Sequence, residues 1–100
     1  MTDNNSRPRP ATIAAAHGGA SDAAFGAVSP PLSFSTTYEF AGYDQPRAYD
    51  HGRAGNPTRD LLADAIARLE GGAGAVITSS GMAAIDLLVS RLSAGNGVLA

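Results

Sequence analysis

The junction at residues 78–82 combines small polar residues with a glycine where a helix is expected to begin. Its sequence is Thr78-Ser79-Ser80-Gly81-Met82. Free N–H groups at a helix N-terminus converge on one point, the helix dipole favours negative charge there, and a glycine lets a phosphate approach the backbone closely. The junction is therefore a candidate anion site, with a plain helix N-cap as the alternative.

A second group of polar side chains lies in a loop rich in glycine. Residues 49–55 gather an aromatic ring, a carboxylate, an imidazole and a guanidinium, which belong to Tyr49, Asp50, His51 and Arg53. An arginine can bind a phosphate through two parallel N–H donors. The alternatives are a solvated arginine and an ordinary surface histidine, because neither residue type is diagnostic of a site when it stands alone in a loop.

Lysine is missing from the sequence. All seven basic residues are arginines, at positions 7, 9, 47, 53, 59, 68 and 91. Chemistry that requires a Schiff base on a side-chain amine must therefore come from a residue outside these 100. We expect no catalytic residue and no metal site in this stretch, and the absence of cysteine excludes disulfides within it.

The two candidate sites flank a predicted helix. Asn56 can cap its start, Pro57 suits its first turn, and Gly71-Gly72 can end it after about Glu70. Its apolar residues fall on one stripe at helical spacing. They are Leu61, Leu62, Ala65, Ile66 and Leu69.

The segments after this helix predict an α/β fold. Residues 73–78 form a short apolar run between turn residues, which is typical of a strand buried on both faces of a parallel sheet. A helix over 82–92 is predicted by apolar residues at three- and four-residue spacings, and residues 98–100 resemble the start of another strand. Helix, strand, helix and strand in this order indicate an α/β layer fold. We expect it to be incomplete here, because a parallel sheet needs several strands.

The first 55 residues are expected to form an extended arm, and residues 56–100 the start of the α/β domain. Ser29-Pro30-Pro31 is held extended by its prolines, and residues 32–40 alternate like a short strand or extended ledge. Pro8 and Pro10 oppose an amphipathic helix near the N-terminus. An arm of this length usually docks on another surface.

Composition excludes several classes of partner. The net charge is −2 and the charges are scattered, so the sequence offers no basic face for nucleic acid. Its apolar runs are far shorter than the roughly 20 residues of a membrane span. We find no secretory signal pattern and expect a cytoplasmic location.

Seven motifs follow one another in order along the sequence. They are Ala11-Thr12-Ile13, Val28-Ser29-Pro30-Pro31, Ser35-Thr36-Thr37-Tyr38, Pro46-Arg47-Ala48, Gly55-Asn56-Pro57-Thr58-Arg59-Asp60, Leu69-Glu70-Gly71-Gly72-Ala73 and Ser79-Ser80-Gly81-Met82-Ala83-Ala84-Ile85. In this order and spacing the sequence resembles the trans-sulfuration family of pyridoxal-phosphate enzymes, which make or cleave cystathionine and its relatives. The resemblance implies an N-terminal arm followed by the first helix-strand-helix of a type I pyridoxal-phosphate transferase domain.

The resemblance also implies roles for particular residues. The backbone N–H groups of Gly81 and Met82 would bind the phosphate of pyridoxal 5'-phosphate, with the Ser80 side chain close by. Arg53 would reach the cofactor phosphate of a neighbouring subunit, and His51 stands where the family has a tyrosine with the same reach. An imidazole N–H can donate to phosphate as well.

Three further positions bear on the substrate. Asp50 matches an acidic residue of the γ-synthase branch and would face the substrate amine, with a turn cap as the alternative. Tyr49 could substitute for the family tyrosine. Ala54 replaces an arginine that the γ-synthase branch often has, which weakens the assignment of a substrate with a distal carboxylate.

Within the family the sequence is most similar to bacterial cystathionine γ-synthases, which join an activated homoserine ester to cysteine in methionine biosynthesis. Cystathionine lyases, methionine γ-lyase and homoserine sulfhydrylases carry similar segments and stay open. The expected partners are an amino-acid substrate and further copies of the chain, as a dimer of dimers. Two other hypotheses are a non-catalytic piece that docks on a full-length paralogue and a generic phosphate-binding fragment.

Overall fold

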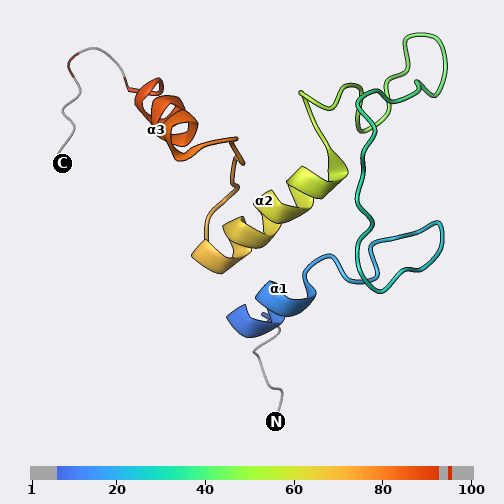
Figure 1. Ribbon diagram of the computed structural model, residues 1–100, viewed down its shortest axis with the longest axis horizontal. Helices are drawn as coiled ribbons and strands as arrows, with labels where there is room; N and C mark the ends of the chain where they lie inside the picture. The colour runs from blue at the N-terminus through green and yellow to red at the C-terminus, as the bar shows by residue number, and fades with distance from the viewer. Residues whose placement is uncertain (1–6, 93–94, 96–100) are drawn as a thin grey trace.

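The structure, a computed structural model, describes residues 7–92 and residue 95 and contains three helices in that part of the chain. Helix α1 spans Pro10–Ala16, α2 spans Pro57–Glu70 and α3 spans Gly81–Val89. Figure 1 shows α1 beside α2, whereas α3 stands apart at the end of an extended linker. No helix among these three is long and apolar enough to cross a membrane.

Helix α1 corrects one expectation. We expected Pro8 and Pro10 to oppose a helix here, yet Pro10 is the first residue of α1. Proline is tolerated at the first helical position because the N–H that it lacks would have no intrahelical partner there. Ile13 is the buried residue of this helix, which packs against α2.

Helix α2 confirms the prediction from its capping residues. The Asn56 side chain accepts hydrogen bonds from Thr58 N at 2.9 Å and Arg59 N at 3.3 Å. At the other end, Gly71 has a left-handed φ of 68°. The predicted apolar stripe of α2 lines one groove, of about 380 Å³, together with Ile13 and Ala14 of α1.

The strand predicted at residues 73–78 is wrong for this chain. The segment runs without regular secondary structure, and the described residues contain two isolated β-bridges but no strand. A strand exists only when a neighbour pairs with its backbone, and no such neighbour lies beside this segment in the described residues. Val76, which we expected to be buried, is 70% exposed. The strand predicted at residues 98–100 lies outside the described residues.

Helix α3 forms where a helix was predicted, with shifted bounds. It begins one residue earlier than expected, with Ser80 as its N-cap, and ends at Val89 rather than Leu92. Its apolar side chains are open to solvent: Met82 is 73% exposed and Leu88 is 70% exposed. Among the described residues, only Ile13 and Ala67 are buried apolar side chains. The chain therefore buries very little core of its own.

The arm is fixed to the start of α2 by two hydrogen bonds at one residue. Ser33 N donates to Thr58 Oγ1 at 2.9 Å, and Asn56 Nδ2 donates to the Ser33 carbonyl at 3.1 Å. Further along, the arm pairs with the loop before α2 through Tyr38 N to the Asp50 carbonyl at 3.0 Å. Of the short strand or extended ledge expected at residues 32–40, the strand does not form, and the segment pairs only by a single bridge, from Thr37 to His51.

Replacing Asn56 by alanine should lower the free energy of unfolding by about 2 kcal/mol. About half comes from the lost N-cap and about half from the lost bond to the arm. N56D is the matched control, because aspartate keeps the cap acceptor and loses only the donor to Ser33, so it should cost about 1 kcal/mol. Urea unfolding followed by circular dichroism measures both. Equal losses in the two variants would contradict the double role.

Replacing Gly71 by alanine should cost about 1 kcal/mol of unfolding free energy, because a side chain is strained at its positive φ. G74A is the control. A Cβ meets no atom within 4 Å at either glycine, but only Gly71 has a positive φ. In thermal unfolding, G71A should have a lower midpoint temperature than G74A. Equal midpoints would show that the left-handed conformation of Gly71 does not contribute to stability.

Candidate functional site

The loop that carries His51 and Arg53 is fixed from two sides at Gly52. Gly52 N donates to the Thr36 carbonyl of the arm at 2.8 Å. The Gly52 carbonyl accepts from Nη1 of Arg59, on α2, at 3.2 Å. A Cβ on Gly52 would lie 3.3 Å from the Thr36 Cα, so the close approach of arm and loop favours glycine here. The arm and α2 together therefore determine where this loop lies.

Hydrogen bonds inside the loop fix its turn. Arg53 N donates to Nδ1 of His51 at 3.2 Å. The His51 carbonyl accepts from Ala54 N at 2.9 Å and from Gly55 N at 3.0 Å. The side chain and the backbone of His51 thus accept hydrogen bonds from the N–H groups of residues 53–55.

His51 and Arg53 line an open pocket of about 370 Å³ together with Arg59. Its lining includes three hydroxyl side chains and no carboxylate. The complete lining is Ser33, Phe34, Ser35, Thr36, His51, Gly52, Arg53, Asn56 and Arg59. Two guanidinium groups and an imidazole in a lining without carboxylates favour an anion, and within the described residues neither arginine forms an ion pair.

A neighbouring pocket connects this loop to the linker before α3. It has a volume of about 330 Å³, and Arg53 and Arg59 line it together with Asp60 and with residues 75–77 of the linker. Arg53 of the loop and Arg59 of α2 therefore share a pocket with the segment that leads to the second candidate site. Ser80, Gly81 and Met82 do not line either pocket.

The second candidate site, at the start of α3, has the expected open geometry. Ser80 Oγ accepts from Ala83 N at 3.2 Å, so Ser80 does act as the N-cap of α3. The cap uses only that amide: within the described residues, the N–H groups of Gly81 and Met82 have no hydrogen-bond partner. A Cβ on Gly81 would meet nothing within 4 Å. An anion can therefore approach these two N–H groups while the cap stays intact.

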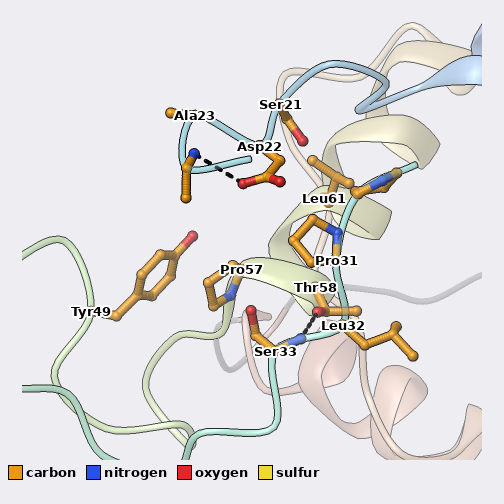
Figure 2. Close-up of a pocket in the computed structure, with 12 residues that line it drawn as sticks. Ser21, Asp22, Ala23, Pro31, Leu32, Ser33, Tyr49, Pro57, Thr58 and Leu61 are labelled. Atoms are coloured by element: carbon orange, nitrogen blue, oxygen red, sulfur yellow. Dashed lines mark hydrogen bonds between the residues drawn. The ribbon is translucent and has the colours of Figure 1, made fainter. Parts of the chain in front are cut away.

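Tyr49 and Asp50 lie away from the anion pocket. The Tyr49 ring packs against the Tyr38 ring at a tilt of 39°, with centroids 5.5 Å apart, and a Cβ on Gly55 would lie 2.9 Å from Cδ1 of Tyr49. Tyr49 lines a different pocket, of about 490 Å³, which Figure 2 shows between the arm and the start of α2. The Asp50 side chain is exposed.

Two polar residues that line these pockets were not predicted as site residues from the sequence. Arg59 lines both arginine pockets, and its only signal was its place inside the motif of residues 55–60. Asp22 lines the pocket in Figure 2, where its carboxylate accepts the N–H groups of Ala24 and Ala27. The hydrogen bond from Ala27 is the main cause that lowers the pKa of Asp22. No sequence pattern marked Asp22.

A sequence model of the family described as Cys/Met metabolism PLP-dependent enzymes matches residues 11–100. The chain belongs to this family. Cystathionine γ-synthase of Escherichia coli (strain K12) is 52% identical over 80 residues, which are 80% of this chain and 21% of that protein. Cystathionine β-lyase of Lactococcus lactis subsp. cremoris (strain MG1363) is 45% identical over 84 residues, 83% of this chain and 22% of that protein.

A solved structure agrees with these relatives. Cystathionine γ-synthase from Xanthomonas oryzae pv. oryzae, in complex with cystathionine, superposes with a TM-score of 0.80 at 52% identity. The match covers 83% of this chain and 21% of that one. The chain thus spans about a fifth of the length of the relatives that it matches.

The family's cofactor, pyridoxal phosphate, fits the groups present in this chain. Its phosphate is a dianion that needs several N–H donors. The described residues offer the unpaired N–H groups of Gly81 and Met82, and a pocket free of carboxylates around Arg53. The nearest carboxylate recorded beside the two arginines is that of Asp60, which lines the adjoining pocket and not the one that contains His51.

Tyr49 gives the site region a pH-dependent signature. Burial raises its pKa, and the hydrogen bond and charge of the Asp60 carboxylate raise it further. As pH rises past about 10, the unfolded chain should therefore lose this proton first, and the free energy of unfolding should fall. D60N should lower the Tyr49 pKa in an ultraviolet titration assigned with Y49F. D86N, on α3, is the control. If D86N lowered the pKa of Tyr49 as much as D60N does, the role of Asp60 would be contradicted.

Proposed function

We propose that the protein carrying residues 1–100 is a trans-sulfuration enzyme that uses pyridoxal phosphate, and that these residues supply phosphate-binding groups of its cofactor site. One observation carries the proposal: in a chain of this family, His51, Arg53 and Arg59 line a pocket that contains no carboxylate. The unpaired amides at the start of α3 support it.

The two groups would bind the phosphate from different copies of the chain. In this chain they line no common pocket, which is compatible with a site shared between subunits. Gly81 N–H and Met82 N–H would bind the phosphate of their own subunit's cofactor, with Ser80 beside them. Arg53 and His51 would reach the cofactor phosphate of a neighbour. When bound, the cofactor supplies an electron sink for chemistry at an amino acid.

The reaction that we propose is γ-replacement on an activated homoserine ester, with cystathionine as a product. The support is the 52% identity with two proteins named cystathionine γ-synthase. Cystathionine β-elimination is the second candidate, because a protein named cystathionine β-lyase is 45% identical over a similar range. Asp50, exposed beside His51, would meet the substrate amine, and Tyr49 would act on the substrate only if its packing against Tyr38 were released.

Residues 1–100 are not proposed to catalyse the reaction by themselves. They include no lysine, and the described part buries only two apolar side chains. The arm exposes large apolar residues, among them Phe25 at 94% and Phe34 at 87%. We propose that residues 1–55 form an arm that docks on another subunit of a dimer of dimers, and that residues 56–100 begin the cofactor-binding domain.

Replacing Arg53 by glutamine should weaken the binding of pyridoxal phosphate about 10- to 100-fold, since it removes a charge-assisted contact to a dianion. R47Q is the matched control, because Arg47 is exposed and lines neither arginine pocket. Fluorescence titration of the purified protein with the cofactor measures both affinities. Equal affinities in R53Q and R47Q would count against the proposed phosphate contact.

A further inference from the structure

The carboxylate of Asp60 lies in the same pocket as two guanidinium groups without pairing with either. Asp60 lines the pocket of about 330 Å³ together with Arg53 and Arg59. Within the described residues, neither arginine forms an ion pair. A carboxylate beside two guanidinium groups ordinarily pairs with one of them, because each offers several N–H donors and the opposite charge. The Asp60 carboxylate has a different partner.

That partner is the hydroxyl of Tyr49. Burial is the main cause that raises the pKa of Tyr49, and the Asp60 carboxylate raises it further through a hydrogen bond with the hydroxyl and through its charge. The positions of the two side chains agree with this contact. A Cβ on Gly55 would lie 2.9 Å from Cδ1 of Tyr49 and 3.9 Å from Oδ2 of Asp60. The ring and the carboxylate therefore lie next to the same point beside Gly55.

The ring of Tyr49 is held from two sides. Tyr38 packs against it with centroids 5.5 Å apart, and Gly55 lies so close that a Cβ there would have to move the ring. Gly55 N in turn donates to the His51 carbonyl at 3.0 Å. The turn of the loop therefore holds the ring whose hydroxyl binds Asp60, in the first turn of α2.

We propose that Tyr49 is a positioning residue: its hydroxyl holds the Asp60 carboxylate and thereby keeps the guanidinium groups of the two arginines available for an anion. Without the hydroxyl, the carboxylate would pair with Arg53 or Arg59 and compete with a phosphate for it. The identity of the anion rests on the proposed function, whereas the competition between Tyr49 and the arginines for Asp60 does not. Tyr49 needs no contact with substrate or cofactor for this role.

Removing the Tyr49 hydroxyl with and without the Asp60 carboxylate separates this role from a merely structural one. Y49F keeps the ring and loses the hydroxyl, D60N removes the competing charge, and Y49F/D60N removes both. Y38F is the matched control, because the Tyr38 hydroxyl is buried and has no hydrogen-bond partner among the described residues.

The purified protein and the four variants are titrated with pyridoxal phosphate and followed by fluorescence. Y49F should bind it about two- to fivefold more weakly, because an ion pair near the surface competes only modestly with a phosphate. The same substitution in the D60N background should have no effect, and Y38F should bind like the unaltered protein. An unchanged affinity in Y49F would overturn the proposal, and so would an equal loss in the presence and absence of the Asp60 carboxylate.

NMR of the arginine side chains tests the competition without cofactor, at about pH 6, where a carboxylate is ordinarily ionised. In Y49F, the Nε–H of Arg53 or Arg59 should exchange with water about two- to fivefold more slowly, since a carboxylate then pairs with it. Y49F/D60N should restore the rate, and Y38F should not change it. Unchanged exchange of both arginines in Y49F would overturn the proposal. If the exchange responds as expected but the unaltered protein binds no pyridoxal phosphate, the proposed function fails and the positioning role of Tyr49 stands.

Discussion

The side chain of Asn56 is the contact on which the described structure depends. Its oxygen accepts two amide N–H groups at the start of α2, and its nitrogen donates to the carbonyl of Ser33 in the arm. One amide therefore starts a helix and joins it to a segment more than 20 residues earlier in the sequence. In a chain that buries only Ile13 and Ala67 among its described apolar side chains, such polar contacts replace a core in determining where the arm lies.

The pocket lined by His51, Arg53 and Arg59 is a consequence of that junction. With the arm beside the start of α2, Thr36 and Arg59 lie on opposite sides of Gly52 and bind its N–H and its carbonyl. The loop is thereby fixed with His51 and Arg53 in a pocket without carboxylates. Arg59 positions the loop and adds positive charge beside it. Backbone contacts therefore determine where His51 and Arg53 lie, and among the three helices only α1 and α2 are in contact.

Local signals in the sequence predicted local features well. The bounds of α2 follow from Asn56, Pro57 and Gly71, whose side chains or backbone preferences act within one helical turn. The second helix was predicted from its apolar spacing over residues 82–92. It begins one residue earlier, at Gly81, and it ends at Val89 although the apolar spacing continues to Leu92. Pro10 was taken as a helix breaker, although at the first position it starts α1.

Non-local features could not be predicted in the same way. A strand at residues 73–78 depends on neighbours that the described residues do not provide, so its apolar composition alone did not decide its structure. The contact of Arg59 with Gly52 depends on how the loop folds back on α2, and no periodicity reports it. His51, Arg53, Ser80, Gly81 and Met82 were chosen from residue types and family motifs; the structure adds their hydrogen bonds and exposure, while their contact with a cofactor stays a proposal.

A crystal structure of the protein with pyridoxal phosphate is the most direct test that one phosphate is bound by groups from two copies of the chain. We expect phosphate oxygens about 3 Å from the N–H groups of Gly81 and Met82 of one subunit and from the Arg53 guanidinium of a neighbour. A phosphate that contacts the start of α3 while every Arg53 points into solvent would contradict it.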